Sequence, residues 1–441
     1  MLSVEGQHLA PDFPRYVAPV PLAKSGRART RAAMATENGA DAAVTSGTFA
    51  EFGGAATKPL LCEHMLHVFP SFGIGGLPLR MVRVINHLGR RFRHTVIALD
   101  NNFEAAEELA GDLDLLLSPS PEQKRGAFRT LLDSAFALRR LRPDLLVTYN
   151  WGAIEWAMAN RLLPGPRHIH IEAGFGRREA DSQLRRRVLF RRWALARCAL
   201  VVVPSRLLHD VARRIWRLPA ERVAYVPNGV DVMRFSSPAR DMVPGFTRGR
   251  NELVIGTVAP LRPEKNVGRL LRVFAMLDVS VSARLVIAGD GAERGPLKRL
   301  AGELGIADRV IFTGRVAPEA VLGTFDVFAL SSDTEQMPNA LLEAMAASRA
   351  VAAVDVGDVK SIVCQENREF IVRRDDGPAF AQAIMQLLHV PEKRHMLGLK
   401  NRERVVAQFS QEQMFAAYSE LFAARPALRR EPPTGHKKCA G

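Results

Sequence analysis

Residues 326–348, DVFALSSDTEQMPNALLEAMAAS, pass from an apolar strand through a polar loop into a helix. Glu335 lies in the loop, Pro338 suits the first turn of the helix, and Glu343 falls on the helix itself. Acidic side chains are favoured near a helix N-terminus, so a purely solvating role for the two carboxylates is the alternative. A carboxylate, free backbone N–H groups and a helix N-terminus still converge beyond one strand. This combination is typical of a site for a sugar phosphate.

The same alternation of strand and helix extends on both sides of this stretch. Short apolar runs separated by amphipathic segments favour parallel strands joined by helical crossovers. In the second half of the chain the runs lie at 252–258, 283–289, 309–314, 326–331, 350–355 and 369–373. In the first half they lie at 64–69, 94–99, 144–149, 167–172, 199–204 and 222–227. The sequence therefore predicts an α/β protein with two Rossmann-like, doubly wound parallel sheets.

Residues 235–251, FSSPARDMVPGFTRGRN, interrupt the alternation with Pro, Gly, Ser and charged residues, and we interpret them as an interdomain linker. We expect the first domain at 59–240 and the second at 250–410. A chain of 441 residues agrees with two cores rather than one. Residues 1–58 and 425–441 lack periodic apolar positions, so we expect a flexible extension and a disordered tail there.

The composition restricts the kinds of partner. The chain carries 61 Lys and Arg against 46 Asp and Glu, a formal net charge of +15. Such a charge attracts nucleotides, anionic lipid surfaces and nucleic acids, and it does not choose among them. The 4 cysteines lie far apart, without the paired spacing of zinc or redox motifs. No apolar run reaches the length of a membrane span or a signal-peptide core, so we expect a cytoplasmic protein.

Two further features lie beyond the carboxyl ends of predicted strands, where parallel sheets bind ligands. Arg262 and Lys265 follow the run at 252–258 and suit a diphosphate, although a solvated surface pair is the alternative. Gly73, Gly75 and Gly76 follow the run at 64–69 and precede a helix, where glycines allow a phosphate to approach the backbone closely. Their spacing is not that of a dinucleotide fingerprint, and tight packing explains them equally well.

Taken together, these motifs resemble the family-four retaining glycosyltransferases of the GT-B fold. The resemblance covers about residues 64–424 and rests on the order of the glycine loop, NGVD at 228–231, Arg262 and Lys265, GDG at 289–291, and the pair Glu335 and Glu343. It implies two Rossmann-like domains that face a central cleft, an N-terminal acceptor domain and a C-terminal nucleotide-sugar donor domain. It also implies that the final helix, at about 411–424, crosses back to the N-terminal domain.

The resemblance further implies a role for each matching residue. The donor diphosphate would be held by Arg262, Lys265, Gly75 and Gly76. Glu335 would be the catalytic carboxylate at the donor sugar. The loop whose backbone also faces the sugar would comprise Gln336, Met337, Pro338 and Asn339. Glu343 would bond the ribose, and Arg315 with Val316 would lie near the base.

The implied activity is transfer of a sugar from a nucleoside-diphosphate sugar to a glycan, a lipid-linked acceptor or a small molecule. Anomeric configuration would be retained, and neither a metal nor another cofactor would be needed. Arg262, Lys265 and the helix N-terminus would stabilise the departing diphosphate in place of a divalent cation. No nucleic-acid partner is expected, and assembly of surface polysaccharide or lipid-linked glycan is the expected setting.

One position departs from the family pattern. Family members often carry a His just before a Gly at the end of an N-domain strand, and RHIHIEAGFG places Ala173 there. A non-catalytic nucleotide-sugar-binding protein of the same fold is therefore an alternative, whereas a dinucleotide oxidoreductase lacks its glycine fingerprint. His168, His170 and Glu172 share one face of the preceding strand, and they either replace part of the missing function or face the core.

Two other charged segments have two interpretations each. The segment from Arg177 to Arg197 interleaves 8 arginines with apolar residues. It either lies on an anionic membrane, as a peripheral contact at the inner face of the plasma membrane, or packs its apolar stripe onto the domain. Asp112 and Asp114 form a D-x-D pattern that suggests a metal, but the pattern lies in an apolar run away from the expected cleft. We interpret these two aspartates as structural.

Overall fold

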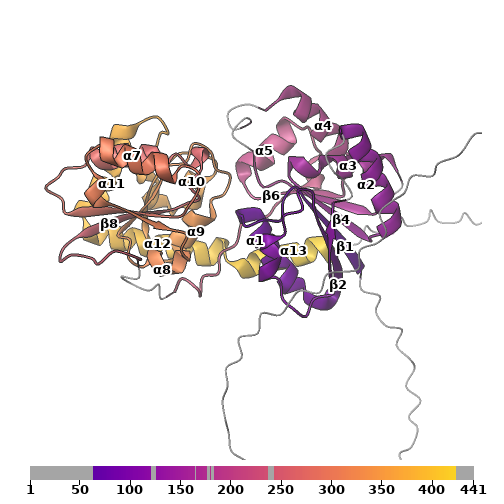
Figure 1. Cartoon of the computed structure of the whole chain (residues 1–441), viewed down its shortest axis with the longest axis horizontal. Coiled ribbons are helices and arrows are strands. Elements are labelled where there is room, and N and C mark those ends of the chain that lie inside the picture. The colour runs from indigo at the N-terminus through magenta and orange to yellow at the C-terminus, as the bar shows by residue number, and fades with distance from the viewer. Residues whose placement is uncertain are drawn as a thin grey trace, which may run out of the picture. The chain divides into compact units, whose positions relative to one another are not determined.

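The computed structural model describes residues 63–120, 126–163, 165–175, 179, 183–236 and 243–423 (Figure 1). The expected N-terminal extension, the expected C-terminal tail and residues 237–242 of the expected linker lie outside this part of the chain. None of the helices described combines the length and the apolar character that crossing a bilayer requires.

The N-terminal lobe is built on a seven-stranded, fully parallel sheet in the order β3-β2-β1-β4-β5-β6-β7. Its strands are β1 (Glu63–Phe69), β2 (Phe92–Ala98), β3 (Leu115–Pro119), β4 (Leu145–Tyr149), β5 (Arg167–Ile171), β6 (Leu200–Val203) and β7 (Val223–Tyr225). The helices that connect them are α1 (Gly76–Leu88), α2 (Ala127–Leu141), α3 (Ile154–Leu162), α4 (Arg185–Leu195) and α5 (Arg206–Arg214).

Both faces of this sheet are buried. Met65 and Phe69 of β1 pack toward α1 and the last helix, α13 (Gln411–Ala423). Leu66 and Val68 alternate with them and pack toward α2 and α3 on the opposite face, where α4 and α5 continue the layer. Because helices cover both faces, the strands read as continuous apolar runs in the sequence.

The C-terminal lobe holds a six-stranded parallel sheet in the order β10-β9-β8-β11-β12-β13. Its strands are β8 (Leu253–Val258), β9 (Ala283–Ala288), β10 (Val310–Gly314), β11 (Val327–Leu330), β12 (Ala350–Val354) and β13 (Ile371–Val372). Its helices are α6 (Val267–Ala275), α7 (Arg294–Glu303), α8 (Pro318–Leu322), α9 (Asn339–Ala346), α10 (Val359–Ile362), α11 (Gly377–His389) and α12 (Pro391–Gln408). The predicted fold class, two doubly wound parallel sheets, is confirmed.

The two lobes belong to one compact unit. The chain passes from one lobe to the other twice, once after β7 and once before α13. The N–H of Val230, after β7, donates to the Phe409 carbonyl at 2.9 Å, so the two crossings run side by side. Beyond them, α13 contributes Tyr418 and Phe422 to the core of the N-terminal lobe. Arg167 of β5 donates to the Phe422 carbonyl at 2.9 Å and so holds the end of α13 against the sheet.

Strand order reverses between β1 and β4 in the first sheet and between β8 and β11 in the second. At such a reversal the two adjacent loops leave the sheet in opposite directions, and the crevice between them is where open α/β sheets bind ligands. The glycine loop follows β1, while Arg262 and Lys265 follow β8, and Glu335 follows β11. The topology therefore predicts a ligand site at these loops.

Candidate active site

The reversal between β8 and β11 brings an ammonium and a carboxylate together. Lys265, in the short helical turn Pro263–Lys265, places Nζ 2.6 Å from Glu335 Oε1. The Ser332 hydroxyl donates to the same oxygen at 2.7 Å. Sequence reasoning assigned Lys265 to a diphosphate and Glu335 to a sugar, and the two side chains in fact contact each other.

A second layer of polar contacts holds this pair in place. The side-chain amide of Asn266 donates to Asp333 Oδ1 at 2.9 Å, and Arg269 donates to the same oxygen at 2.7 Å. Arg269 also donates to the Ser331 carbonyl at 2.6 Å. The first turn of α6 is thereby tied to the loop that carries Glu335. Sequence reasoning missed these supporting residues, because nothing in their spacing shows that the two loops meet.

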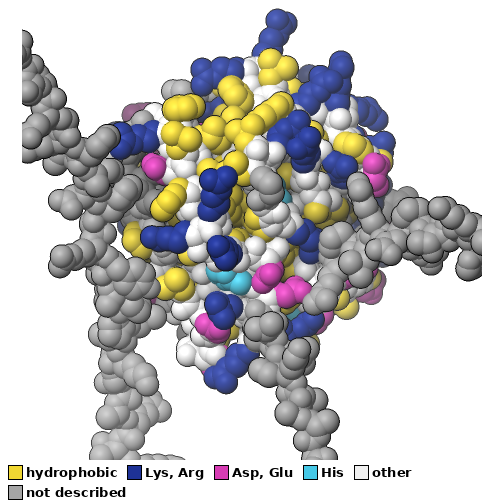
Figure 2. Space-filling view, turned by 90° about the vertical axis from the view of Figure 1, so that its right-hand side faces the viewer, with side chains coloured by type: hydrophobic (Ala, Val, Ile, Leu, Met, Phe, Trp, Pro, Cys, Tyr) yellow, Lys and Arg dark blue, Asp and Glu magenta, His cyan; other side chains and the backbone are white. Residues whose placement is uncertain are grey.

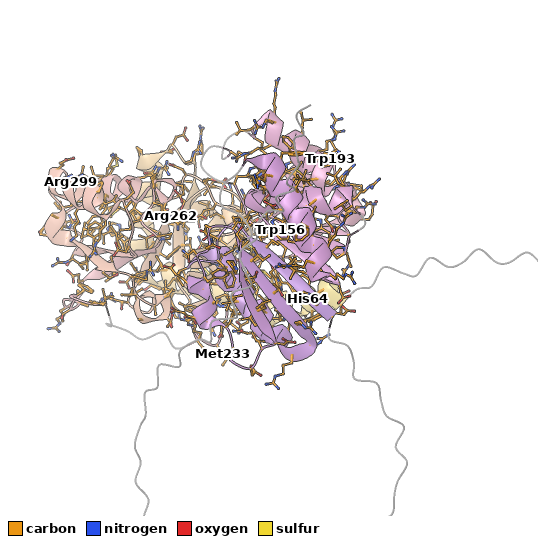
Figure 3. The ribbon with its side chains drawn as sticks, turned by 45° about the vertical axis from the view of Figure 1, so that its right-hand side comes forward. His64, Trp156, Trp193, Met233, Arg262 and Arg299 are labelled. Carbon is orange, nitrogen blue, oxygen red and sulfur yellow. The ribbon has the colours of Figure 1, made fainter. Side chains whose placement is uncertain are left out.

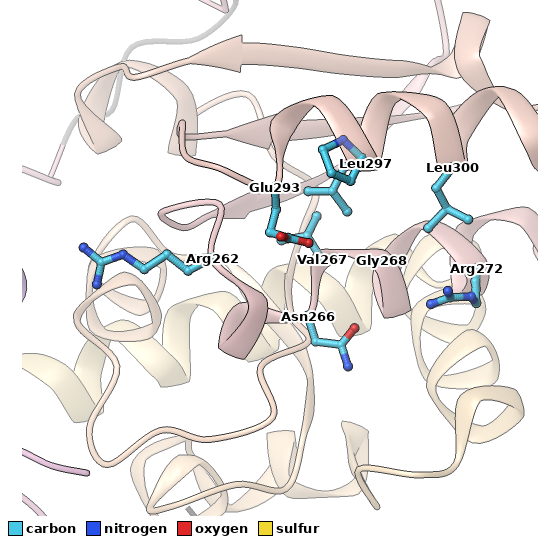
Figure 4. Close-up of a pocket in the computed structure, with 9 residues that line it drawn as sticks. Arg262, Asn266, Val267, Gly268, Arg272, Glu293, Leu297 and Leu300 are labelled. Atoms are coloured by element: carbon cyan, nitrogen blue, oxygen red, sulfur yellow. The ribbon is translucent and has the colours of Figure 1, made fainter. Parts of the chain in front are cut away.

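Arg262 is exposed, and among the residues described its guanidinium has no ion-pair partner. It lies on the rim of a cavity of about 300 Å³ between α6 and α7, lined among others by Asn266, Glu293 and Leu297. Figure 4 shows the guanidinium pointing away from these other lining residues. Arg262 is therefore available to a ligand outside that cavity.

The glycine loop of the N-terminal lobe lies against the start of α9. A Cβ built on Gly76 would lie 3.5 Å from Asn339 Nδ2, and Gly75 is the residue before the first turn of α1. Asn228, from the NGVD motif, donates its side-chain amide to Asn339 Oδ1 and to the Met337 carbonyl, both at 2.8 Å. The loop 336–339 is thus contacted by two separate segments of the N-terminal lobe.

The structure also places Ala173 beside this loop. Asn150, after β4, accepts the Ala173 N–H at 2.7 Å. The next residue, Gly174, has φ of 149°, and a Cβ there would lie 2.9 Å from Gln336 Cγ. Position 173 therefore lies close to the loop 336–339, and at this place the chain offers a methyl group instead of an imidazole.

The nearby histidines face the core rather than this loop. His168 hydrogen-bonds with Thr148 Oγ1 at 2.7 Å and with Cys198 Sγ at 2.9 Å. Burial lowers the pKa of His168 to about 3. His170 shares Thr148 at 2.8 Å. The core alternative for His168, His170 and Glu172 is therefore correct.

Glu172 belongs to a buried charge cluster below α4. Arg191 Nε lies 3.4 Å from Glu172 Oε2, and Arg191 also donates to Glu179 at 3.1 Å. The guanidinium carbon of Arg191 lies about 5 Å from the ring centroids of Trp151, Phe175 and Trp216. This cluster explains the single acidic residue at the end of β5 as a structural partner of α4.

The side-chain carboxyl of Glu343, unlike that of Glu335, has no hydrogen-bond partner among the residues described. Its carboxyl points from α9 into surroundings that raise its pKa to about 6, because burial disfavours the charged form more than Arg83 and Arg234 favour it. A ligand that donates hydrogen bonds to this carboxyl would stabilise its ionised form.

The remaining predicted site residues lie farther along the sheet. Arg315 and Val316 follow β10, the outermost strand, where Arg315 is exposed and Val316 packs against the core. Among the described residues no hydrogen bond or ion pair joins either of them to Lys265 or Glu335. Asp112 and Asp114 form surface ion pairs with Arg90 and Arg93 at 3.8 and 3.4 Å, which agrees with their structural interpretation.

Two Rossmann-like lobes, joined so that the loops of both sheets meet around residues 336–339, define the GT-B class of fold. Two family models match consecutive parts of the chain. The model "Glycosyltransferase Family 4" matches residues 74–234, and "Glycosyl transferases group 1" matches residues 245–404. The chain belongs to glycosyltransferase family 4.

Individual relatives agree with this assignment. N-acetyl-alpha-D-glucosaminyl L-malate synthase of Bacillus anthracis is 28% identical over 173 residues, which are 39% of this chain and 45% of the relative. A GDP-mannose-dependent alpha-(1-6)-phosphatidylinositol monomannoside mannosyltransferase of Mycobacterium tuberculosis is 29% identical over 48% of this chain and 58% of its own length. The chain thus matches about half the length of these curated relatives.

The fold is also found in solved structures. The Anabaena protein HepE, solved in complex with UDP and glucose, superimposes with a TM-score of 0.68 at 16% sequence identity. The match covers 82% of this chain and 99% of HepE. At this identity the likeness concerns the fold alone.

Proposed function

We propose that this chain is a glycosyltransferase that moves a sugar from a nucleoside-diphosphate sugar to a glycan, a lipid-linked acceptor or a small molecule. The observation that carries the proposal is the Lys265–Glu335 pair, which lies at the strand reversal of the C-terminal lobe with the loop 336–339 directly beside it. A cation for a diphosphate and a carboxylate for a sugar lie within one hydrogen bond of each other. Membership of family four supports the same reaction class.

In the proposed complex the diphosphate binds between Arg262, Lys265 and the glycines at 75 and 76. Among the residues described, Arg262 has no ion pair and Lys265 pairs with one carboxylate, so both have donors left for phosphate oxygens. The N-terminus of α9, which no side chain of the described residues caps, adds backbone N–H groups at the same place. These groups stabilise the charge that develops on the departing diphosphate without a metal.

The sugar and the nucleoside occupy the two sides of the diphosphate in this proposal. Glu335 faces the sugar, together with the backbone of residues 336–339. The side-chain carboxyl of Glu343, which has no hydrogen-bond partner among the described residues, accepts from the ribose hydroxyls. The base lies toward Arg315 and Val316, after β10.

The reaction proceeds with retention in this proposal, as the family implies. The acceptor attacks from the face of the sugar that the diphosphate leaves, and the departing diphosphate accepts the acceptor's proton. The sugar passes through an oxocarbenium-like state, whose positive charge the Glu335 carboxylate stabilises. Lys265 keeps that carboxylate in position by its 2.6 Å contact.

The names of relatives support a sugar-nucleotide donor and a lipid-linked acceptor. The M. tuberculosis relative is by its name dependent on GDP-mannose and acts on a phosphatidylinositol monomannoside. HepE was solved with UDP and glucose. These names favour UDP-sugars and GDP-sugars as the first donors to test.

The second candidate is a nucleotide-sugar-binding protein without transferase activity. The specific observation in its favour is Ala173, which lies beside the donor loop where many family members place an imidazole. Donor binding is common to both candidates, and only turnover separates them.

The test is a thermal-shift screen of UDP-sugars and GDP-sugars, followed by detection of released nucleoside diphosphate with each donor that binds. Transfer or slow hydrolysis of a bound donor is the expected result. Tight binding without release, with water and with a panel of glycan and lipid acceptors, favours the binding protein. The absence of any binding contradicts the whole proposal.

A further inference from the structure

The outer surface of α2, α3 and α4 exposes an unusual number of large apolar side chains. On α2, Phe128 is 74% exposed and Phe136 is 63% exposed, and Leu132 lies between them. These three residues are spaced by four, so they form one stripe along the helix. On α4, Leu189 is 63% exposed and Trp193 is 38% exposed. We call the exposed side chains of these three helices the α2–α4 face.

The α2–α4 face is continuous because α3 packs against both α2 and α4. A hollow of about 410 Å³ between α3 and α4 is lined by Met158, Arg186, Leu189, Phe190 and Trp193. A second hollow of about 400 Å³ lies between α2 and α3 and includes Arg139 and Arg142 in its lining. Figure 2, which shows the right-hand side of Figure 1, has hydrophobic side chains gathered in its upper part with Lys and Arg around them.

The exposed charges on this face have a single sign. Every fully exposed charged side chain on α2, α3 and α4 is an arginine, and the acidic residues of these helices, Asp133 and Glu155, are half-buried. An ordinary solvated surface mixes exposed charges of both signs. These arginines are Arg129, Arg139, Arg140, Arg185, Arg186 and Arg192. Several basic side chains lie over aromatic rings, as Arg161 does over Trp193 at 4.7 Å and Arg186 over Phe190 at 5.9 Å. The rings and the guanidinium groups are therefore presented together.

We propose that the α2–α4 face docks the protein onto the surface of an anionic lipid bilayer. Exposed aromatic and aliphatic side chains enter the boundary between headgroups and acyl chains, while arginines reach the lipid phosphates around them. Charge complementarity selects this occupant, because six exposed arginines without an exposed acidic side chain on the same helices match a continuous negative surface. The inference stands independently of the proposed transferase activity.

The packing of α4 shows how one helix serves two purposes. Arg191, Ala194 and Leu195 face inward, and Arg191 is held by Glu172 and Glu179. Arg185, Arg186 and Arg192 remain outside. The two interpretations of the segment from Arg177 to Arg197 are thus compatible for its described residues, since packing uses one side and leaves the arginines and Trp193 of the other side exposed. Residues 176–178 and 180–182 lie outside the described part of the chain.

The first experiment measures binding of the full-length protein to vesicles of phosphatidylcholine, with and without phosphatidylglycerol, by flotation. Binding to the anionic vesicles that weakens with added salt is expected.

In the triple variant Arg185→Gln, Arg186→Gln, Arg192→Gln the partition coefficient should fall on the order of a hundredfold, because each basic residue contributes about fivefold. The matched control, Arg250→Gln, Lys298→Gln, Arg299→Gln, removes three exposed charges from the other lobe and should bind as the wild type does. Figure 3 labels Trp193 in the N-terminal lobe and Arg299 in the other.

The second experiment tests the apolar contribution. The variant Phe128→Ser, Phe136→Ser should lose about tenfold or more of its vesicle affinity, while Met276→Ser, Val279→Ser in the C-terminal lobe should lose none. Of the 4 tryptophans, Trp156 and Trp216 are fully buried, Trp151 is half-buried and Trp193 is exposed, so a blue shift of tryptophan emission on vesicle binding should come mainly from Trp193. Trp193→Phe should keep binding and lose most of the shift.

Three results would overturn the proposal. One is equal binding to neutral and anionic vesicles, or none to either. Another is an equal loss of binding in the C-terminal control variants. The third is a change in oligomeric state of the Phe128→Ser, Phe136→Ser variant without a change in vesicle binding, which would make the face a contact between copies of this chain. Each readout is independent of sugar transfer, so failure of the proposed function leaves these results interpretable.

Discussion

The two lobes share a doubly wound topology, but the charged pair at the strand ends is partly exposed in one lobe and fully buried in the other. In the C-terminal lobe the Lys265–Glu335 pair lies in loops beyond the carboxyl ends of β8 and β11, with the side chains 20% and 9% exposed. In the N-terminal lobe Arg191 and Glu172 lie under α4 with side chains 1% and 0% exposed. The first pair can exchange a partner for a ligand, whereas the second has no access to one. A charged residue at a strand end therefore indicates a ligand site only when a loop, and not a helix, covers it.

The largest effect is expected from the buried pair. Arg191→Gln leaves Glu172 without its arginine partner, whereas Glu179 keeps Arg187, and stranding a buried charge typically costs about 3–5 kcal/mol. The midpoint of denaturant unfolding should fall strongly, while turnover per folded molecule stays unchanged. The matched control is Arg192→Gln, the exposed neighbour on the same helix, which should have little effect on the midpoint. Equal midpoints for the two variants would show that the buried cluster contributes little.

A smaller loss, in binding rather than in stability, is expected from the exposed pair. Lys265→Ala should weaken the binding of nucleoside diphosphate by about 1.5–3 kcal/mol, the usual contribution of a charge-assisted hydrogen bond. Calorimetry would measure the affinity, with Lys298→Ala on α7 as the control for loss of one exposed charge in the same lobe. Unchanged affinity in a folded Lys265→Ala protein would show that the diphosphate does not bind at Lys265.

The raised pKa of Glu343 predicts a pH dependence of donor binding. Ribose hydroxyls donate to the ionised carboxylate, so binding favours loss of the proton and strengthens as pH rises through about 6. Affinity should fall about tenfold from pH 7 to pH 5, and Glu343→Gln should remove this dependence. The measurement needs the intact nucleotide sugar, because a free diphosphate carries a terminal phosphate that titrates in the same range. An unchanged profile in Glu343→Gln would place the titrating group elsewhere.

The smallest effect expected is that of metal removal. Cations of the chain itself are proposed to stabilise the leaving diphosphate, so sugar transfer should continue in EDTA at its original rate. Rates measured in EDTA, and again after addition of Mg²⁺ or Mn²⁺, provide the check. Strict dependence on an added cation would contradict the proposed role of Arg262 and Lys265.

The sequence was sufficient for the two parallel sheets because both are covered on both faces, and each fully buried strand forms an apolar run. β3 (Leu115–Pro119) was the exception. Its residues follow Asp112 and Asp114 in the sequence, and it lies at the edge of its sheet. We interpreted this short run only as the surroundings of the D-x-D pattern and did not predict a strand. An edge strand has one neighbour instead of two, so it can be short and only partly buried.

The site could be predicted in its residue types but not in its contacts. Lys265 and Glu335 are 70 residues apart, and they meet only because β11 lies next to β8 in the sheet. Period-two alternation correctly placed His168, His170 and Glu172 on one face. It gave no sign of Arg191, which reaches that face from a helix later in the chain. Which side chains of other elements contact a residue depends on the order of the strands in the sheet. The spacing of residues along the sequence does not reveal that order.

The central claim is that Glu335 and Glu343 perform different tasks in one donor site. The most direct test compares Glu335→Gln with Glu343→Gln by steady-state kinetics and by calorimetric binding of free nucleoside diphosphate. Glu335→Gln should lower kcat by about 10²–10³ with nearly unchanged diphosphate affinity, because its charge acts on the sugar in the transition state. Glu343→Gln should mainly raise the donor KM, since a ribose contact is equally strong in the ground and transition states. Wild-type kinetics in both folded variants would show that the two carboxylates only solvate α9, and the proposed site would be wrong.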